Sequence, residues 1–244
     1  MTPALDEIWV YLSASPLLGL TLTLAAYQAA FWLYRRAGFH PLANPVLLSV
    51  AMLAGVLLIT RTPYQTYFDG AQFVHFLLGP ATVALAIPLY AQWPKLKSMA
   101  GPLVIALVAG SLTAALSAWG IGAALGASRE SLMSLAPKSV TTPIAMAVAE
   151  RLGGLPSLTA VLVISTGILG AIGARYIYRW LRIDDHAVRG FAIGIASHGI
   201  GTARAFQLSE QAGAFAALAM GLNGLVTALS LPWIMPWVER LAGR

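Results

Sequence analysis

Residues 135–154 read LAPKSVTTPIAMAVAERLGG and interrupt a chain that is otherwise strongly apolar. They stand between two long apolar runs, where another membrane helix would be expected. Pro137 and Pro143 remove backbone donors and clash with the preceding turn, so they predict a break in the helix. Broken backbone at membrane depth persists only where protein buries it or where it lines a wet cavity. A lysine at such a break, here Lys138, predicts a site for a small anion.

Three hydroxyl side chains follow this lysine: Ser139, Thr141 and Thr142. Beside an ammonium group they would donate hydrogen bonds to the carboxylate and hydroxyl of a small organic acid. Two other interpretations stay open. Lys138 can snorkel to the interface if the segment is shallow. The two threonines can instead bond the carbonyls that Pro143 leaves free.

The composition predicts an all-α, multi-pass membrane protein. Of 244 residues, 58% are hydrophobic and 10% are charged, whereas soluble domains have about 25% charged residues. The apolar runs are long enough to span a bilayer as helices, and they lack the alternation of barrel strands. The net charge of +6 indicates cytoplasmic basic loops and not a nucleic-acid partner.

No catalytic pattern is visible in the sequence. The chain has no cysteine, which excludes disulfides and Cys-ligated metals, and its four histidines lack metal-ligand spacing. The string GIASHG at 194–199 resembles a nucleophile elbow but lacks the required strand–turn–helix context. We therefore expect a protein that is not an enzyme and that has no cofactor and no metal.

We expect about seven to eight helices, some of them broken or re-entrant. Basic loops place both ends of residues 132–152 on one side of the membrane, which predicts a re-entrant segment. Gly79 and Pro80 predict a second break, and 191–208 is expected to cross as a third broken segment. Arg240 and Arg244 then favour a cytoplasmic C-terminus. Full spans are expected at 17–34, 45–59, 71–93, 102–127, 157–180 and 213–237.

A weak internal repeat relates two parts of the chain. LGPATVALAI at 78–87 aligns with LAPKSVTTPI at 135–144, an offset of 57 residues (135 − 78) that also pairs Gly110 with Gly167. The spans that contain these glycines have opposite predicted orientations, so we expect an inverted repeat, as in transporters. Chance similarity between two apolar, proline-containing stretches is the alternative. One transmembrane domain is expected over 1–244, divided into the first two spans (1–60), the two repeat halves (70–127 and 131–183) and the third broken segment with the last span (188–238).

A second polar segment reads ASHGIGTARAF and includes His198 and Arg204. Gly199 and Gly201 each lower helix propensity by roughly 1 kcal/mol relative to alanine, so they predict unwound backbone. The guanidinium of Arg204 fits a carboxylate in a bidentate way. Because a histidine side chain ordinarily titrates near neutral pH, His198 could carry a coupled proton.

Simpler interpretations of these polar residues stay open as well. Arg204 can lie at a membrane surface, and a lone histidine such as His198 is more often a packing residue with a satisfied ring. Thr202 would add a hydroxyl to the anion site. Asn223, in the last span, is either a contact for the anion or a hydrogen-bonded link between helices.

Three strings resemble the LrgB/CidB family of bacterial membrane proteins. They are PKSVTTPIAMAVAERLGGLPSLTAV at 137–161, ASHGIGTARAF at 196–206 and AMGLNGLVTALSLP at 219–232. The similarity covers about 45–236, and the carboxy-terminal half of the plastidial glycolate/glycerate translocator is similar too. The first family motif often has a further acidic residue where this chain has Ala147, so no role for that acid is expected here.

The resemblance implies a multi-pass protein of the bacterial inner membrane and allows two functions. Plant relatives, and bacterial members linked to pyruvate, point to a secondary transporter of monocarboxylates such as glycolate, glycerate, lactate or pyruvate. Other members are described as antiholin-like. The alternative is therefore an antiholin- or holin-like regulator of murein hydrolase export and cell lysis, acting with a small LrgA/CidA-type partner. Glycine-rich helix faces favour a homodimer.

In the transporter interpretation, Lys138 and Arg204 converge from two interrupted helices on one watery pocket inside the bilayer. Together they neutralise the carboxylate of the substrate. The N-termini of the broken helices add their positive dipoles to the site. Alternating access would move the broken segments against a scaffold of early spans.

Overall fold

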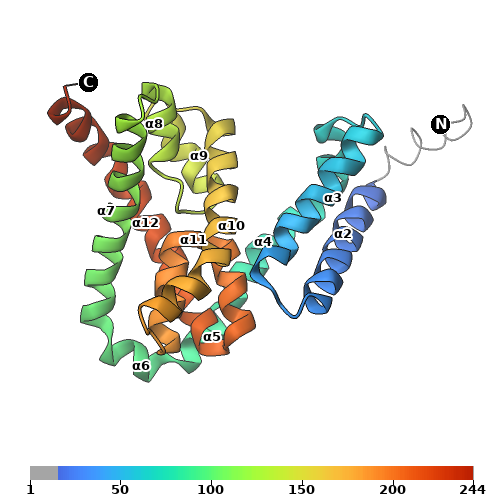
Figure 1. The fold of residues 1–244 in the computed structure, drawn as a ribbon, viewed down its shortest axis with the longest axis horizontal. Helices are drawn as coiled ribbons and strands as arrows, with labels where there is room; N and C mark the ends of the chain where they lie inside the picture. Colours follow the sequence, from blue (N-terminus) through green and yellow to red (C-terminus); the bar gives the residue numbers. More distant parts are fainter. Residues whose placement is uncertain (1–15, 244) are drawn as a thin grey trace, which may run out of the picture. The chain divides into compact units, whose positions relative to one another are not determined.

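The computed structural model describes residues 16–243, in two compact units whose boundary in the sequence falls between Ala84 and Leu85. All regular elements of this described part are helices (Figure 1). Five of its helices are long and apolar enough to span a membrane, which confirms the predicted all-α, multi-pass fold. They are Leu17–Arg36, Tyr64–Ala91, Ala100–Ala124, Pro156–Trp180 and Glu210–Leu241, and the shorter Pro45–Ile59 is also apolar.

The first unit contains α2 (Pro16–Arg36), η1 (Pro41–Ala43), α3 (Pro45–Ile59) and α4 (Tyr64–Ala84). The side chain of Asn44 caps α3, because its Oδ1 accepts from the N–H groups of Val46 at 2.9 Å and Leu47 at 3.1 Å. α2 and α4 are linked by a hydrogen bond of 2.7 Å between the hydroxyls of Thr23 and Tyr67. Local capping and helix packing thus account for this unit.

The break expected at Gly79 and Pro80 is wrong. α4 continues through Pro80 and ends at Ala84, so the interruption falls at Leu85, before α5 (Ala86–Ala91). One proline removes a single backbone donor, and a helix can continue past it with a kink.

The second unit contains the remaining helices: α5, α6 (Trp93–Ser98), α7 (Ala100–Ala124), α8 (Arg129–Leu135), α9 (Thr142–Arg151), α10 (Pro156–Trp180), α11 (His186–Leu208) and α12 (Glu210–Leu241). Its core has two main hydrophobic clusters, one around α8 and α9 and one around α11. Leu132 and Met133 of α8 pack with Trp119 of α7 and Met235 of α12. A second cluster joins α11 to the opposite ends of the same two spans.

The segment α8–α9 returns to the side of the membrane from which it enters. The N–H of Leu155 donates to Oγ of Ser134 at 2.7 Å, and a Cβ on Gly153 would lie 3.1 Å from Nη1 of Arg129. The start of α8 therefore lies beside the chain that follows α9, as Figure 1 shows. This confirms the predicted re-entrant segment, and residues 136–141 form its tip.

Helix α11 is a second hairpin with its tip at Ser197–His198. Ser197 (φ −131°, ψ 15°) and His198 (φ 40°, ψ −133°) leave helical geometry. Beyond the tip, a Cβ on Gly201 would lie 2.7 Å from the carbonyl oxygen of Ile193. Eight residues of straight helix would span about 12 Å, so the arms 186–196 and 199–208 run back along each other.

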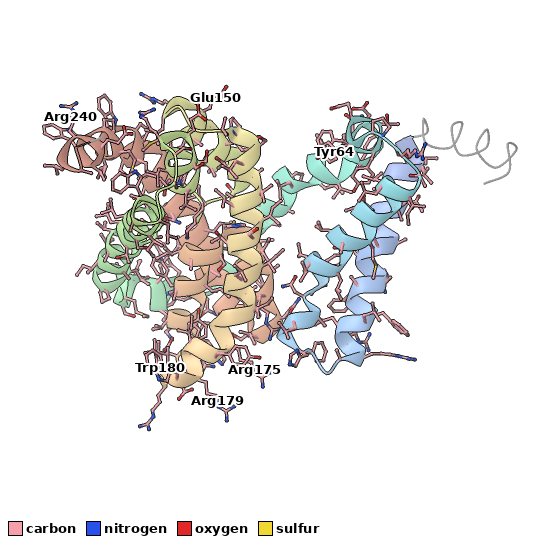
Figure 2. All side chains as sticks on the ribbon, turned by 45° about the horizontal axis from the view of Figure 1, so that its top comes forward. Tyr64, Glu150, Arg175, Arg179, Trp180 and Arg240 are labelled. Carbon is pink, nitrogen blue, oxygen red and sulfur yellow. The ribbon has the colours of Figure 1, made fainter. Side chains whose placement is uncertain are left out.

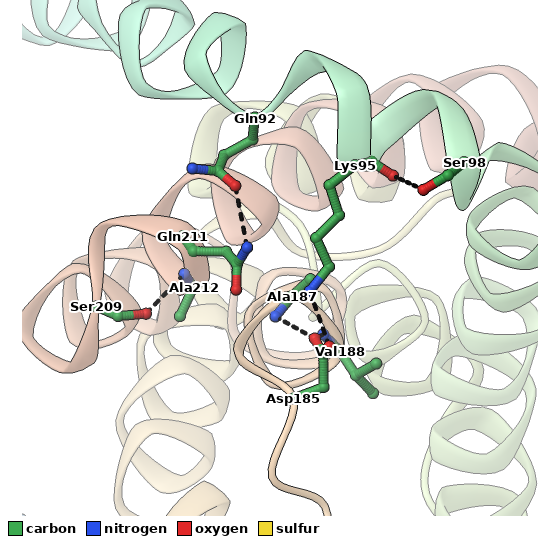
Figure 3. A network of polar contacts seen from close by, with 9 residues as sticks. All are labelled: Gln92, Lys95, Ser98, Asp185, Ala187, Val188, Ser209, Gln211 and Ala212. Carbon is green, nitrogen blue, oxygen red and sulfur yellow. Dashed lines mark hydrogen bonds and ion pairs between the residues drawn. The ribbon is translucent and has the colours of Figure 1, made fainter.

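Both roots of the α11 hairpin are attached to the same short stretch of chain. Lys95 Nζ lies 2.8 Å from Oδ2 of Asp185, just before α11. Gln211, just after it, donates from Nε2 to Oε1 of Gln92 at 3.0 Å (Figure 3). The expectation that 191–208 crosses the membrane is therefore wrong: the chain enters and leaves on one side.

The break in α11 also precedes the glycines that predicted it. It lies at Ser197–His198, whereas Gly199 and Gly201 lie in the returning arm. Gly201 is needed for close packing of the two arms, because a side chain there would meet the backbone of Ile193. The positive φ is adopted instead by His198, whose conformation tertiary contacts must hold.

The charged side chains distinguish the two ends of the second unit. Figure 2 shows Arg175, Arg179 and Trp180 at one end and Glu150 and Arg240 at the other. The first end has Lys95, Lys97, Arg175, Arg179, Arg182, Arg189 and Arg204 against Asp184, Asp185 and Glu210, and the other has Arg129, Arg151 and Arg240 against Glu130, Glu150 and Glu239. The excess of basic residues marks the first end as cytoplasmic.

This orientation corrects the expected side of the last helix. α12 begins at the cytoplasmic end, because the α11 hairpin returns there, and it therefore ends outside. Arg240 lies at that outer end, and Arg244 falls outside the described residues.

Two similar halves of opposite orientation make up most of the second unit. Each is a full span followed by a hairpin: α7 with α8–α9, then α10 with α11. The offset of 57 residues still pairs α7 with α10 through Gly110 and Gly167. Each observed half begins with its span, however, whereas the expected halves 70–127 and 131–183 end with it.

Candidate anion site at the hairpin tips

The two tips meet at Asn223, near the middle of the 32-residue helix α12. This side chain is 1% exposed. Its Nδ2 donates to the carbonyl of Ser139, in the tip of α8–α9, at 3.3 Å and to that of Ile195, near the tip of α11, at 3.0 Å. Its Oδ1 accepts from Oγ of Ser111 in α7 at 2.6 Å. The tips of the two hairpins therefore meet at mid-depth of the spanning helices.

Lys138 lies half-buried in the tip of α8–α9. Its Nζ donates to Oγ of Ser139 at 3.3 Å, and the backbone carbonyl of that serine accepts from Asn223, which also binds near the opposite tip. None of the ion pairs within residues 16–243 includes Lys138. A cation at this depth without an acidic partner is costly unless an anion or water compensates it.

His198 connects the tip of α11 to α10. Its Nε2 lies 3.0 Å from the carbonyl oxygen of Val163, and because that oxygen can only accept, Nε2 is the protonated ring nitrogen. Oγ1 of Thr202 donates to the carbonyl of His198 at 2.8 Å. A Cβ on Gly167 would lie 2.9 Å from the ring. These contacts hold the unusual backbone conformation, and a role in proton coupling stays a prediction.

The first turn of α9 begins beside Lys138. Thr141 is the N-cap residue, yet its side chain makes no capping hydrogen bond. Pro143 lies in the first turn, where a missing donor costs nothing. The first amides of a helix have no partners within it, so this N-terminus adds positive potential near the ammonium group. The half-buried hydroxyls of Thr141 and Thr142 flank the same turn.

Arg204 does not join this group. It lies in the returning arm of α11, six residues beyond His198, which corresponds to about 9 Å along a helix. Its Nη1 donates to Oε1 of Gln207 at 3.0 Å. The structure therefore places Lys138 at the tips and Arg204 toward the cytoplasmic root. The expected convergence of the two cations is not observed.

The sequence interpretation missed three residues of the site. Ser111 was indistinguishable from any lone serine in an apolar span. Ser197 forms the bend itself, is 0% exposed, and its Oγ has no hydrogen-bond partner among the described residues. Val163 supplies only a backbone carbonyl, which no sequence pattern reveals.

Two apolar grooves lie beside the hairpins. One, of ≈ 600 Å³, runs between α7 and the entering arm of α11, and the other, of ≈ 420 Å³, lies between α9 and α12 with Arg151 in its lining. Across the described residues, no group of three or more His, Asp or Glu side chains is placed to hold a metal ion.

The fold defines a multi-pass membrane protein in which two re-entrant hairpins enter from opposite faces and meet at mid-depth. The LrgB-like family model matches residues 23–237, and the chain belongs to this family, which confirms the resemblance.

Relatives in Bacillus align over most of the chain. The uncharacterized protein YwbG of Bacillus subtilis (strain 168) is 37% identical over 222 residues, which is 91% of this chain and 98% of that protein. The antiholin-like protein LrgB of Bacillus cereus (strain B4264) is 31% identical over 227 residues, 92% of this chain and 97% of that protein. No solved structure matches the chain.

Proposed function

We propose that the protein is a secondary carrier of small monocarboxylates in the bacterial inner membrane, and not an enzyme. One observation supports this most directly: Lys138 lies at the meeting point of two opposed hairpins without an acidic partner among the described residues. A carrier needs such a site at mid-depth, reachable from either face in turn.

The chemistry of the tips suits a substrate with one carboxylate. Lys138 supplies one positive charge, and the first turn of α9 supplies further positive potential. The hydroxyls of Ser139, Thr141 and Thr142 are the right groups for a carboxylate and an adjacent hydroxyl or keto group. Thr202 is less suited, because its hydroxyl already binds the carbonyl of His198. Glycolate, glycerate, lactate and pyruvate all fit this description.

Uptake of labelled glycolate into proteoliposomes tests the proposal. We expect Lys138→Ala to lower the initial rate by about tenfold to a hundredfold, since a hydrogen bond to a charged group contributes about 1.5–3 kcal/mol. Lys97→Ala is the matched control, because it removes a lysine that lies over the ring of Trp93 at the membrane surface. Uptake that is absent in the wild type, or equal in the two folded variants, would contradict the carrier function.

The names of relatives favour a second candidate, an antiholin-like regulator of murein hydrolase export and lysis. It would act as a homodimer or with a small holin-like LrgA/CidA-type partner, and it requires no turnover of a substrate. Under this alternative, Lys138→Ala would leave lysis control unchanged, and reconstituted protein would show no saturable uptake.

A further inference from the structure

We propose that Asn223 is a positioning residue that couples the two hairpin tips, and that it is not a ligand of the anion. The predicted effect of Asn223 on transport rests on the proposed carrier function. The predicted effect on the structure is that the two tips loosen together when the amide is lost, and it is independent of that function.

The amide of Asn223 has no bonding capacity left for a substrate. Nδ2 has two protons, and both point to carbonyl oxygens, those of Ser139 and Ile195. Oδ1 accepts from the hydroxyls of Ser111 and Thr227. Because carbonyls only accept, the orientation of the amide is determined by its partners.

Three of these four bonds join separate parts of the second unit to α12, and the fourth, from Thr227, lies within α12. Ser111 belongs to the full span α7, and the two carbonyl acceptors belong to opposite hairpins. Asn223 thus binds the tips of both hairpins through one nitrogen. A displacement of either tip therefore strains or breaks a bond to the same nitrogen.

The position of Ser139 connects this link to the anion site. Its hydroxyl accepts from Lys138 while its backbone carbonyl accepts from Asn223. An anion that draws Lys138 toward itself acts on this residue and, through the shared amide, on Ile195 in α11. Occupancy of one hairpin is thereby transmitted to the other.

Hydrogen exchange measured by mass spectrometry on the full-length protein in nanodiscs tests the coupling without any substrate. Asn223→Asp keeps the shape of the side chain but places oxygen against both carbonyls. We expect exchange to rise by about tenfold in peptides covering 136–141 and also 193–201, because two buried hydrogen bonds are lost together. Ser111→Ala is the matched control, since it leaves both donor bonds in place, and we expect less than about twofold at either tip.

A change confined to one tip, no change at either tip, or an equal rise throughout α10 would overturn the proposal. Asn223→Ser removes the amide without adding charge and replaces the aspartate variant if that variant does not fold. Acidification supplies a further readout, because a protonated aspartate can donate one of the two lost bonds. Glycolate uptake by Asn223→Asp, relative to wild type at the same pH, should recover partly as the pH falls, and a ratio that stays constant would count against the coupling.

The two proposals fail separately. If Lys138→Ala abolishes uptake while Asn223→Asp leaves exchange at both tips unaltered, only the coupling is lost. If no glycolate uptake is detected while both tips loosen together, the coupling stands and the carrier function is lost.

Discussion

The two hairpins resemble each other at their tips and differ at their roots. At the outer face, Arg129 binds Glu239 through two contacts, Nε to Oε1 at 2.8 Å and Nη2 to Oε2 at 3.0 Å; the glutamate side chain is 11% exposed and the arginine side chain 59%. At the cytoplasmic face, Lys95 makes one contact with Asp185, and their side chains are 33% and 46% exposed. Bidentate pairs are stronger than single contacts, and the carboxylate of the outer pair is better shielded from solvent than that of the cytoplasmic pair. The α11 hairpin is thus the one whose root opens more easily.

Variants that disturb the close packing between the arms of a hairpin should have the largest effect on stability. The loss should be similar in the two hairpins. In Gly201→Ala the new Cβ would meet the carbonyl oxygen of Ile193 at 2.7 Å, and in Gly154→Ala it would meet the backbone nitrogen of Ser134 at 2.8 Å. We expect each variant to lose about 1–3 kcal/mol of stability, measured by thermal unfolding in detergent.

The control for this pair is Gly199→Ala, in the same arm as Gly201. Its Cβ would have only Sδ of Met220 nearby, at 3.8 Å. We expect it to be neutral or slightly stabilising, because alanine favours helix. Loss of stability in the control, or unchanged stability in both test variants, would show that the arms are not packed as described.

Replacing each root carboxylate by its amide should separate the two hairpins. Glu239→Gln leaves Arg129 beside a largely buried neutral group, and we expect a loss of about 1–2 kcal/mol. Asp185→Asn should cost less than about 1 kcal/mol, since the exposed pair is screened and asparagine still caps α11. Thermal unfolding measures both changes. Equal losses, or a larger loss for Asp185→Asn, would remove the proposed difference between the roots.

Acid should have the smallest effect, a loosening of the cytoplasmic root. The hydrogen bond from Lys95 lowers the pKa of Asp185 below its ordinary value of 3.8. The stabilising contribution is therefore complete above that ordinary value and is lost as the pH falls through the lowered pKa. A fluorophore on a single cysteine at Ser98 should report opening in that acidic window. Asp185→Asn should show no such transition, whereas a transition that persists in this variant would have another origin.

Much of the fold could be predicted from local patterns. Long apolar runs identified the spans, and Pro137 and Pro143 identified the re-entrant segment. These signals are strong because a bilayer leaves a chain few choices: backbone groups must be paired within helices, and breaks must be sheltered. The alternation of basic loops then determined the side of each span up to α10.

The second hairpin could not be predicted in the same way. Gly199 and Gly201 pointed to the right region, but the reversal occurs at Ser197–His198 because contacts from Val163 and Thr202 hold a histidine at positive φ. An arginine six residues beyond a break is equally compatible with a tip and with a root. Only the reversal of the chain decides this for Arg204.

The sequence alone therefore determined that this is a helical membrane protein of the LrgB-like family with a lysine at a sheltered break. The tertiary structure decided that two hairpins enter from opposite faces, that α12 ends outside, and that Asn223 lies between the tips. The physical reason is range: hydropathy and proline act within a few residues, whereas the bonds from Asn223 join residues 28 and 84 positions apart in the chain.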